Sequence, residues 1–196
     1  KISKPKPGDT VIVTGAAGGV GSIAGQIFKI SGCKVYGIAG GKDKCEMLID
    51  EFGFDGAVDY KSEDLNEALK NLCPNGADIV YDNVGGRILN DCLLHLAQNA
   101  RIAICGIISR HKTDNMNFGP ENYSNLIFKR ATMQGFLVLD YMNEAHVARK
   151  RIKKWIKDGL LVCKEDIKEG FENAPDTLKG LFDGQNKGKQ LLKITN

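Results

Sequence analysis

The chain has 196 residues, of which 42% are hydrophobic and 26% are charged, and its net charge is +3. This composition is typical of a globular protein, and so small a net charge does not by itself indicate a nucleic-acid partner. No apolar run approaches membrane-spanning length, and no signal peptide is visible.

Residues 1–9 are typical of a linker that leads into the first predicted strand. Lys1 is not a methionine, and the strand follows almost at once. We therefore expect the chain to be a piece of a longer protein whose N-terminal part is missing.

A glycine-rich turn follows the first strand, in the stretch 10–22, TVIVTGAAGGVGS. A β-branched run precedes the glycines and a stretch with helical periodicity follows them, which is the context of a phosphate-binding turn. Gly15 allows a sharp turn, Gly18 lets a pyrophosphate approach the backbone, and Gly21 lets the helix pack closely on the strand. The N–H groups and the dipole of that helix would face the phosphates. The pattern predicts a dinucleotide site, and the alternative is a plain tight turn.

Strands and helices alternate along the chain as far as residue 158. The predicted strands are 11–13, 34–39, 56–60, 78–83, 101–108 and 131–138, and the predicted helices are 22–30, 42–52, 62–72 (or 63–72), 86–96, 121–129 and 144–158. Most of these strands are apolar without strict alternation, which is typical of a parallel sheet covered on both faces. The sequence therefore predicts an α/β fold, a Rossmann-type doubly wound parallel sheet of six strands in the order 3-2-1-4-5-6.

The pattern changes after residue 158. A strand-like stretch covers 160–169, a short helix with Pro175 near its start covers 174–182, and a turn and a last strand cover 183–195. We therefore expect this strand–helix–strand segment to lie outside the parallel sheet. We therefore divide the chain into a nucleotide-binding domain, 1–158, and a C-terminal segment, 159–196.

The end of the second strand distinguishes NAD from NADP. An NAD site usually has an acidic residue about 20 residues after the glycines, which holds the ribose 2′-OH. Here the strand ends in Gly40-Gly41, and Lys42 and Lys44 follow. Two lysines in a first helical turn oppose the helix dipole, and a bound 2′-phosphate would offset this repulsion. The residues favour NADP, and the alternative is that the lysines are solvated and Asp43 holds the ribose.

Other site patterns fit less well. Residues 14–21 also fit TGxxxGxG, which resembles short-chain dehydrogenases, but no tyrosine has the required lysine four residues on. Residues 184–189 are too short for a P-loop. The basic run 149–154 is interpreted as a solvated helix end rather than a nucleic-acid contact. His111 ends the loop after the fifth strand, beside the expected nicotinamide, and is our candidate catalytic residue.

The six cysteines stand at positions 33, 45, 73, 92, 105 and 163. None forms a CxxC pair, so their spacing indicates neither a zinc site nor a redox motif. We expect no metal site, and reduced thiols in a protein of the cytoplasm.

Several stretches together carry a resemblance to a known family. They are GAAGGVGSIAGQ (15–26), GCKVYGIAGGKDK (32–44), DYK (59–61), YDNVGG (81–86), RIAICGIIS (101–109), MQGFLVLDY (133–141) and EGFENAPDTLKGLFDGQNKGK (169–189). In this order they resemble the zinc-independent branch of the medium-chain dehydrogenase/reductase superfamily that holds leukotriene 12-hydroxydehydrogenases, prostaglandin reductases and alkenal double-bond reductases. The resemblance covers nearly the whole chain. It implies an NADPH-dependent oxidoreductase that reduces the C=C bond of α,β-unsaturated ketones and aldehydes, so the substrate is an activated alkene.

The resemblance also implies which residues bind NADP. The phosphates would lie on the glycine turn, the 2′-phosphate on Lys44 and Tyr60, and the nicotinamide end near Asn186. The implied set is Gly18, Gly19, Val20, Gly21, Lys44, Tyr60, Asn83, Cys105, Gly106, Ile107, Ile108, Ser109, His111, Phe136, Leu137, Val138 and Asn186. The family commonly has a tyrosine where His111 stands, and some members have another where Phe128 stands, so a tyrosine proton donor does not carry over to this chain.

The family's N-terminal GroES-like substrate domain is absent from this chain. The segment from about Gly159 resembles the piece of that catalytic domain that returns after the nucleotide-binding domain. The resemblance further implies a two-fold homodimer in which the edge strands 131–138 pair, with no nucleic-acid or membrane partner. The alternative function is a quinone-oxidoreductase-like protein or a non-catalytic nucleotide-binding protein, crystallin-like or RNA-binding.

Overall fold

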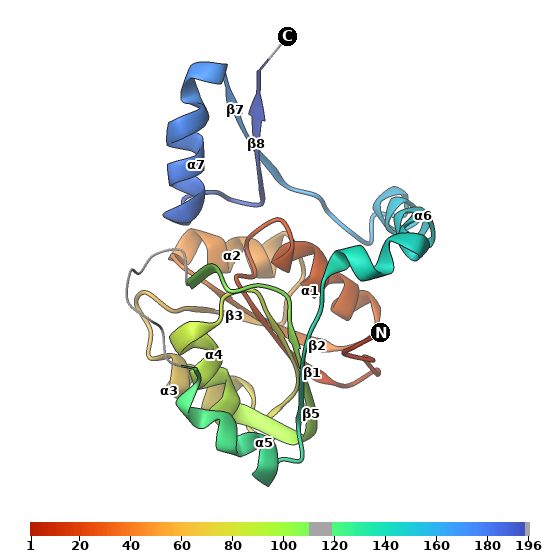
Figure 1. Cartoon of the computed structure of the whole chain (residues 1–196), viewed down its shortest axis with the longest axis vertical. Helices are drawn as coiled ribbons and strands as arrows, with labels where there is room; N and C mark the ends of the chain where they lie inside the picture. The colour runs from red at the N-terminus through yellow and green to blue at the C-terminus, as the bar shows by residue number, and fades with distance from the viewer. Residues whose placement is uncertain (110–118, 195–196) are drawn as a thin grey trace.

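The computed structural model describes residues 1–109 and 119–194. Its main body is a six-stranded sheet with the strand order β3-β2-β1-β4-β5-β6, in which neighbouring strands are parallel (Figure 1). The strands of the chain are β1 Thr10–Thr14, β2 Lys34–Ala39, β3 Gly56–Asp59, β4 Ala77–Asp82, β5 Leu96–Ile104, β6 Thr132–Gly135, β7 Glu165–Glu169 and β8 Lys189–Lys193. The predicted fold class and strand order are confirmed.

Helices cover both faces of this sheet. The α-helices are α1 Gly21–Ile30, α2 Lys42–Asp50, α3 Leu65–Leu72, α4 Gly86–Cys92, α5 Asn125–Phe128, α6 Ala145–Lys157 and α7 Ala174–Phe182, and the 3-10 turns are η1 Leu93–His95, η3 Glu121–Ser124, η4 Val138–Glu144 and η5 Phe171–Asn173. Within the described ranges, no helix combines the length and apolar character needed to cross a membrane.

Side chains alternate between the two faces along β1. Ile12 belongs to the apolar cluster that includes residues of α3 and α4, whereas Val11 and Val13 belong to the cluster that includes residues of α1 and α2. All three side chains are 0% exposed. Because both faces are covered, every central position of the strand is apolar, which explains why its sequence lacks a period-two pattern.

The fifth strand begins and ends earlier than predicted. We expected a helix as far as Leu96 and a strand over 101–108, but β5 starts at Leu96, which is 1% exposed in the core. At the other end, the backbone N–H groups of Cys105 and Gly106 both donate to the carbonyl oxygen of Asp82, at 2.7 and 3.2 Å. Because two successive N–H groups donate to one carbonyl, the regular ladder with β4 breaks there and the strand ends before residue 108.

The sixth strand lies at the edge of the sheet, as predicted, but it spans only Thr132–Gly135 rather than 131–138. The helix predicted over 121–129 is a 3-10 turn followed by the short helix α5. Pairing of two copies through β6 stays a prediction.

The C-terminal segment forms a separate two-stranded parallel sheet, β7-β8, with α7 beside it at one end of the molecule (Figure 1). The strand predicted over 160–169 begins only at Glu165, because the residues before it contact α1 instead. The Gln26 side chain donates to the carbonyl of Val162 at 2.9 Å and accepts from its N–H at 2.7 Å, and Leu161 is 2% exposed. The division of the chain into two domains at residue 158 stays a prediction.

The adjacent leucines of η1 provide a matched test of this core, because Leu93 is 0% exposed and Leu94 is 45% exposed. Leu93→Ala should lower the free energy of unfolding by about 2–5 kcal/mol, since it leaves a cavity. Leu94→Ala should lower it by about 1 kcal/mol or less. Chemical denaturation of both variants measures the difference, and equal losses would contradict this packing.

Candidate functional site

A cavity of about 930 Å³ opens at the carboxyl ends of the main strands. Its walls come from the turns after β1, β2, β3, β4 and β5 and from the C-terminal segment. In open parallel sheets, ligands bind at this edge, and sites for small molecules and cofactors are typically about 300–1,000 Å³.

Most of the sequence-predicted binding residues line this cavity: Gly18, Gly19, Val20, Gly21, Lys44, Tyr60, Asn83, Cys105, Gly106, Ile108, Ser109 and Asn186. Among the described residues, Ile107 and 136–138 are predicted members that do not line it. Leu137 and Val138 are exposed on the surface, and Phe136 packs against the rings of Tyr81 and Tyr141. His111 lies outside the described residues, so its catalytic role stays a prediction.

The glycine turn between β1 and α1 folds back on itself. The N–H of Gly18 donates to the carbonyl of Gly15 at 3.2 Å, and Gly15 has a φ of +59°, which favours glycine. A Cβ at Gly21 would lie 2.3 Å from the same carbonyl oxygen, so no side chain fits there. At Gly18, by contrast, the nearest atom to an added Cβ would be 3.5 Å away. The space beside Gly18 is therefore left to the cavity rather than filled by packing.

A buried carboxylate ties β1 to β4. Asp82 is 0% exposed, and it accepts hydrogen bonds from the Thr14 hydroxyl at 2.6 Å and the Gly85 N–H at 2.9 Å. Burial raises the pKa of Asp82, and these hydrogen bonds oppose the rise. Thr14 also holds Asn83, whose backbone N–H donates to the hydroxyl at 2.9 Å and whose side-chain amide donates to the carbonyl at 2.7 Å. The sequence analysis did not identify Asp82 and Thr14 as site residues. The signal for both was a polar residue at the end of a buried strand.

A second carboxylate, Asp59 at the end of β3, holds the turn between β2 and α2. It accepts hydrogen bonds from the N–H of Gly41 at 2.7 Å, the N–H of Lys61 at 3.0 Å and the hydroxyl of Ser62 at 2.7 Å. The hydrogen bond from Gly41 is the main reason that the pKa of Asp59 lies below its ordinary value, and burial opposes this effect. Sequence reasoning missed this residue as well, although it directly precedes the predicted Tyr60.

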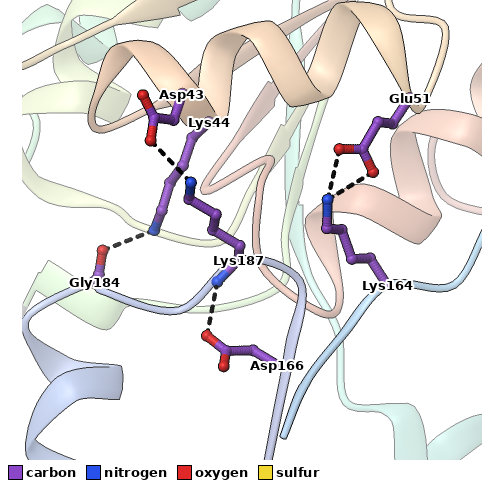
Figure 2. A network of polar contacts seen from close by, with 7 residues as sticks. All are labelled: Asp43, Lys44, Glu51, Lys164, Asp166, Gly184 and Lys187. Carbon is purple, nitrogen blue, oxygen red and sulfur yellow. Dashed lines mark hydrogen bonds and ion pairs between the residues drawn. The ribbon is translucent and has the colours of Figure 1, made fainter.

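Lys44 lines one end of the cavity, and the charges of Lys61 and Lys187 lie close enough to act on it; we call these three residues the lysine cluster. The Lys44 ammonium donates to the carbonyl of Gly184 at 2.7 Å (Figure 2). Burial lowers the pKa of Lys44, and the charges of Lys61 and Lys187 lower it further. An anion bound among these groups would be attracted by the whole cluster and would relieve their mutual repulsion.

Gly40 leaves room for the residues that complete this end of the cavity. A Cβ at Gly40 would lie 2.8 Å from Cε of Lys61 and 3.0 Å from Cε1 of Tyr60. Asp43, the alternative ribose ligand, instead pairs with Lys187, with 2.9 Å between its Oδ2 and the lysine Nζ.

The C-terminal segment builds the wall opposite the sheet. The N–H of Gly188 donates to the carbonyl of Ala17 at 2.9 Å, which fixes the segment on the glycine turn. Asn186 is 8% exposed and donates to the carbonyl of Gly188 at 2.8 Å. A Cβ at Gly19 would lie 2.9 Å from Cδ and 3.3 Å from Cα of Lys189, so the segment packs closely on this side of the turn too.

The other end of the cavity carries an unpartnered hydroxyl. Ser109 lines the cavity, and its Oγ is the buried side-chain polar atom that lacks a hydrogen-bond partner in the ranges 1–109 and 119–194. Buried polar groups are normally satisfied, so this hydroxyl is suited to a polar atom of a ligand. A dinucleotide therefore fits the residues present: bare glycines at its middle, cations at one end and an open hydroxyl at the other.

No cluster suited to a metal ion is found among the described side chains, where no group of three or more His, Cys, Asp or Glu comes together. All six cysteines are free thiols.

Residues 19–154 match the family model described as zinc-binding dehydrogenase. The 2-alkenal reductase (NADP(+)-dependent) of Nicotiana tabacum is 43% identical over 196 residues, covering 100% of this chain and 57% of that protein. Prostaglandin reductase 1 of Bos taurus is 43% identical over 191 residues, covering 96% of this chain and 57% of that protein. The crystal structure of CurA from Vibrio vulnificus in complex with NADPH superposes with a TM-score of 0.93 at 40% identity, covering 100% of this chain and 59% of that one. The chain thus spans less than two thirds of the length of each of these relatives.

The hydrogen bonds of Asp59 lead to a prediction about stability and pH. Asp59→Asn should lower the free energy of unfolding by about 1–3 kcal/mol near neutral pH, because charge-assisted hydrogen bonds at the β2–α2 turn are weakened. The folded-state pKa of Asp59 lies below the ordinary value of 3.8, so its contribution is present above that value and is lost as the pH falls through the folded-state pKa. The difference between the two proteins should therefore shrink in urea denaturation as the pH is lowered below about 4.

Asp50→Asn is the matched control, because Asp50 is exposed on the neighbouring helix α2. It should change the free energy of unfolding by about 0.5 kcal/mol or less at either pH. A difference for Asp59→Asn that stays constant as the pH falls would contradict the role given to its carboxylate.

Proposed function

We propose, since the chain belongs to the medium-chain dehydrogenase/reductase family, that it is the cofactor-binding part of an NADPH-dependent reductase. The substrate class would be α,β-unsaturated ketones and aldehydes, of which the C=C bond is reduced. Two named relatives, an alkenal reductase and a prostaglandin reductase, support this reaction class. We place the enzyme in the cytoplasm as a homodimer, in line with the sequence-based expectation.

The observation that carries the proposal is that one cavity connects the glycine turn with Lys44 of the lysine cluster. Gly18 lines the cavity at the start of α1, and Lys44 and Tyr60 line it beyond the ends of β2 and β3. The dinucleotide pyrophosphate and the adenosine 2′-phosphate need this combination, since the first binds at a helix N-terminus and the second needs cations. NADPH is therefore the proposed cofactor, a choice that the solved structure of CurA with NADPH supports.

Each wall of the cavity would hold one part of the cofactor. Gly18 and the first N–H groups of α1 would hold the pyrophosphate, and Lys44 and Tyr60 would hold the 2′-phosphate. Asn83, fixed by Thr14, and the buried Ser109 hydroxyl would orient the nicotinamide end. The cofactor, when bound, supplies the hydride for the β-carbon of the activated alkene.

The residues of this chain would contribute orientation and exclusion of water rather than covalent chemistry. The proton for the α-carbon needs a separate donor, and His111 is our proposed candidate for it. The runner-up function is a quinone-oxidoreductase-like or a non-catalytic nucleotide-binding protein. Reduction of an alkene by the complete protein distinguishes the two, because a non-catalytic relative would bind NADPH without consuming it.

NADPH should bind more tightly than NADH, and Lys44→Ala should remove most of this preference. The variant should lose about ten- to a hundredfold in NADPH affinity, because a charge-assisted contact to the 2′-phosphate is lost. Its NADH affinity should stay unchanged. Isothermal titration calorimetry with both cofactors measures the dissociation constants.

Lys34→Ala is the matched control, because Lys34 is an exposed lysine at the opposite end of β2. It should leave both affinities unchanged. Equal affinities for NADPH and NADH in the unsubstituted chain would overturn the choice of NADP.

The chain by itself should be a poor catalyst. Hydride transfer needs an alkene held beside the nicotinamide with water excluded, and the relatives' chains extend well beyond the part that this chain covers. NADPH oxidation with a simple enone should therefore be slower by about a hundredfold or more than in the complete protein. If the two rates were equal, the active site would lie within these residues, and His111 would be the first candidate to test.

A further inference from the structure

An ion pair joins the C-terminal segment to α2 beside the lysine cluster. The Lys187 ammonium lies 2.9 Å from Oδ2 of Asp43, and Figure 2 shows its side chain reaching toward α2 next to Lys44. Neither partner lines the cavity, but Lys44 and Asn186, their neighbours in the chain, both line it. Asn186, which the resemblance puts near the nicotinamide end, therefore lies beside Lys187 next to the proposed 2′-phosphate site, and the pair lies at the rim of that site.

Asp43 stands where a carboxylate would oppose NADPH. It lies in the first turn of α2, at the distance of about 20 residues after the glycines where an acidic residue holds the ribose 2′-OH of NAD. Its side chain is 75% exposed and therefore free to turn. An uncompensated carboxylate here would repel a 2′-phosphate and would accept a hydrogen bond from a 2′-OH.

The C-terminal segment holds Lys187 in place over Asp43. The backbone N–H of Lys187 donates to Oδ2 of Asp166 at 3.2 Å, and the next residue, Gly188, is hydrogen-bonded to Ala17 at 2.9 Å (Figure 2 shows the contact with Asp166). The ammonium holds the pKa of Asp43 below its ordinary value, and Asp43 raises the pKa of Lys187. Both groups are consequently charged at neutral pH.

We propose that Lys187 sets a preference for NADPH over NADH by neutralising Asp43. The ion pair cancels the negative charge at the rim and keeps the carboxylate oxygens away from the ribose. Lys44 and Lys61 can then face the 2′-phosphate without an opposing charge. Lys187 is thus a specificity-determining residue that acts through Asp43, and the assignment rests on the proposed function because it concerns the same site.

A different role for Lys187 would be direct contact with the 2′-phosphate. The two roles differ in what happens when Asp43 is removed together with Lys187. If Lys187 acts by neutralising Asp43, Asp43→Asn should restore the NADPH affinity that Lys187→Ala removes. If Lys187 contacts the 2′-phosphate directly, Asp43→Asn should not restore that affinity.

The test measures dissociation constants for NADPH and NADH by calorimetry on the whole 196-residue chain. Lys187→Ala should weaken NADPH binding by about fivefold, because the charge of Asp43 is exposed, and should leave NADH binding equal or tighter. The double variant Asp43→Asn/Lys187→Ala should bind NADPH within about twofold of the unsubstituted chain. Raising the salt concentration should reduce the effect of Lys187→Ala, since both charges are exposed.

Lys164→Ala is the matched control. Lys164 joins the same segment to Glu51, directly after α2, with 2.5 Å between Nζ and Oε1, but it lies outside the lysine cluster. Its removal should leave the ratio of NADPH to NADH affinity unchanged.

Equal weakening of both cofactors by Lys187→Ala would overturn the proposal, because it would show that the lysine only shapes the turn. Failure of Asp43→Asn to restore NADPH binding would overturn it in favour of direct contact. A failure of the proposed function has a different signature: the unsubstituted chain would then show no preference for NADPH at all.

Discussion

The close approach of two backbone segments at the glycine turn is the constraint on which the cavity depends. An added Cβ at Gly21 would lie 2.3 Å from the carbonyl oxygen of Gly15, so α1 can begin directly against the end of β1. The same bare turn receives the C-terminal segment, through the hydrogen bond from Gly188 to Ala17. One stretch of backbone therefore forms the floor of the cavity and the contact that builds its opposite wall.

Two carboxylates make the remaining walls rigid, and each acts on a neighbouring strand rather than its own turn alone. Asp82 of β4 holds Thr14 of β1, and Asp59 of β3 holds Gly41 after β2. The N–H and O–H groups that donate to each carboxylate offset its loss of hydration. The carboxylate and its donors therefore hold one another in place in the folded chain. The turns at the carboxyl edge are thereby positioned before any ligand arrives, which reduces the ordering that binding would require.

The charges of the lysine cluster, unlike the apolar core, do not stabilise one another in the unliganded chain. Burial and two neighbouring cations lower the pKa of Lys44, so this arrangement does not stabilise the unliganded fold. A local conflict of this kind is typical of a binding site, where the ligand supplies the missing counter-charge. Lys44 of the lysine cluster, the glycine turn and the unpartnered Ser109 hydroxyl are three such features of one cavity.

The sequence alone determined the order of the strands, the position of the glycine turn and the family. Its apolar runs and helical periods are local patterns, and each reflects which faces of a short segment are buried. The C-terminal end of β5 could not be predicted in this way, because backbone hydrogen bonds to Asp82 on another strand stop it at Ile104. The roles of Asp82 and Asp59, and the pairing of Asp43 with Lys187 across 144 positions of the chain, were decided only by tertiary structure. Such contacts depend on which side chains the fold brings to one edge of the sheet, and no local period encodes that placement.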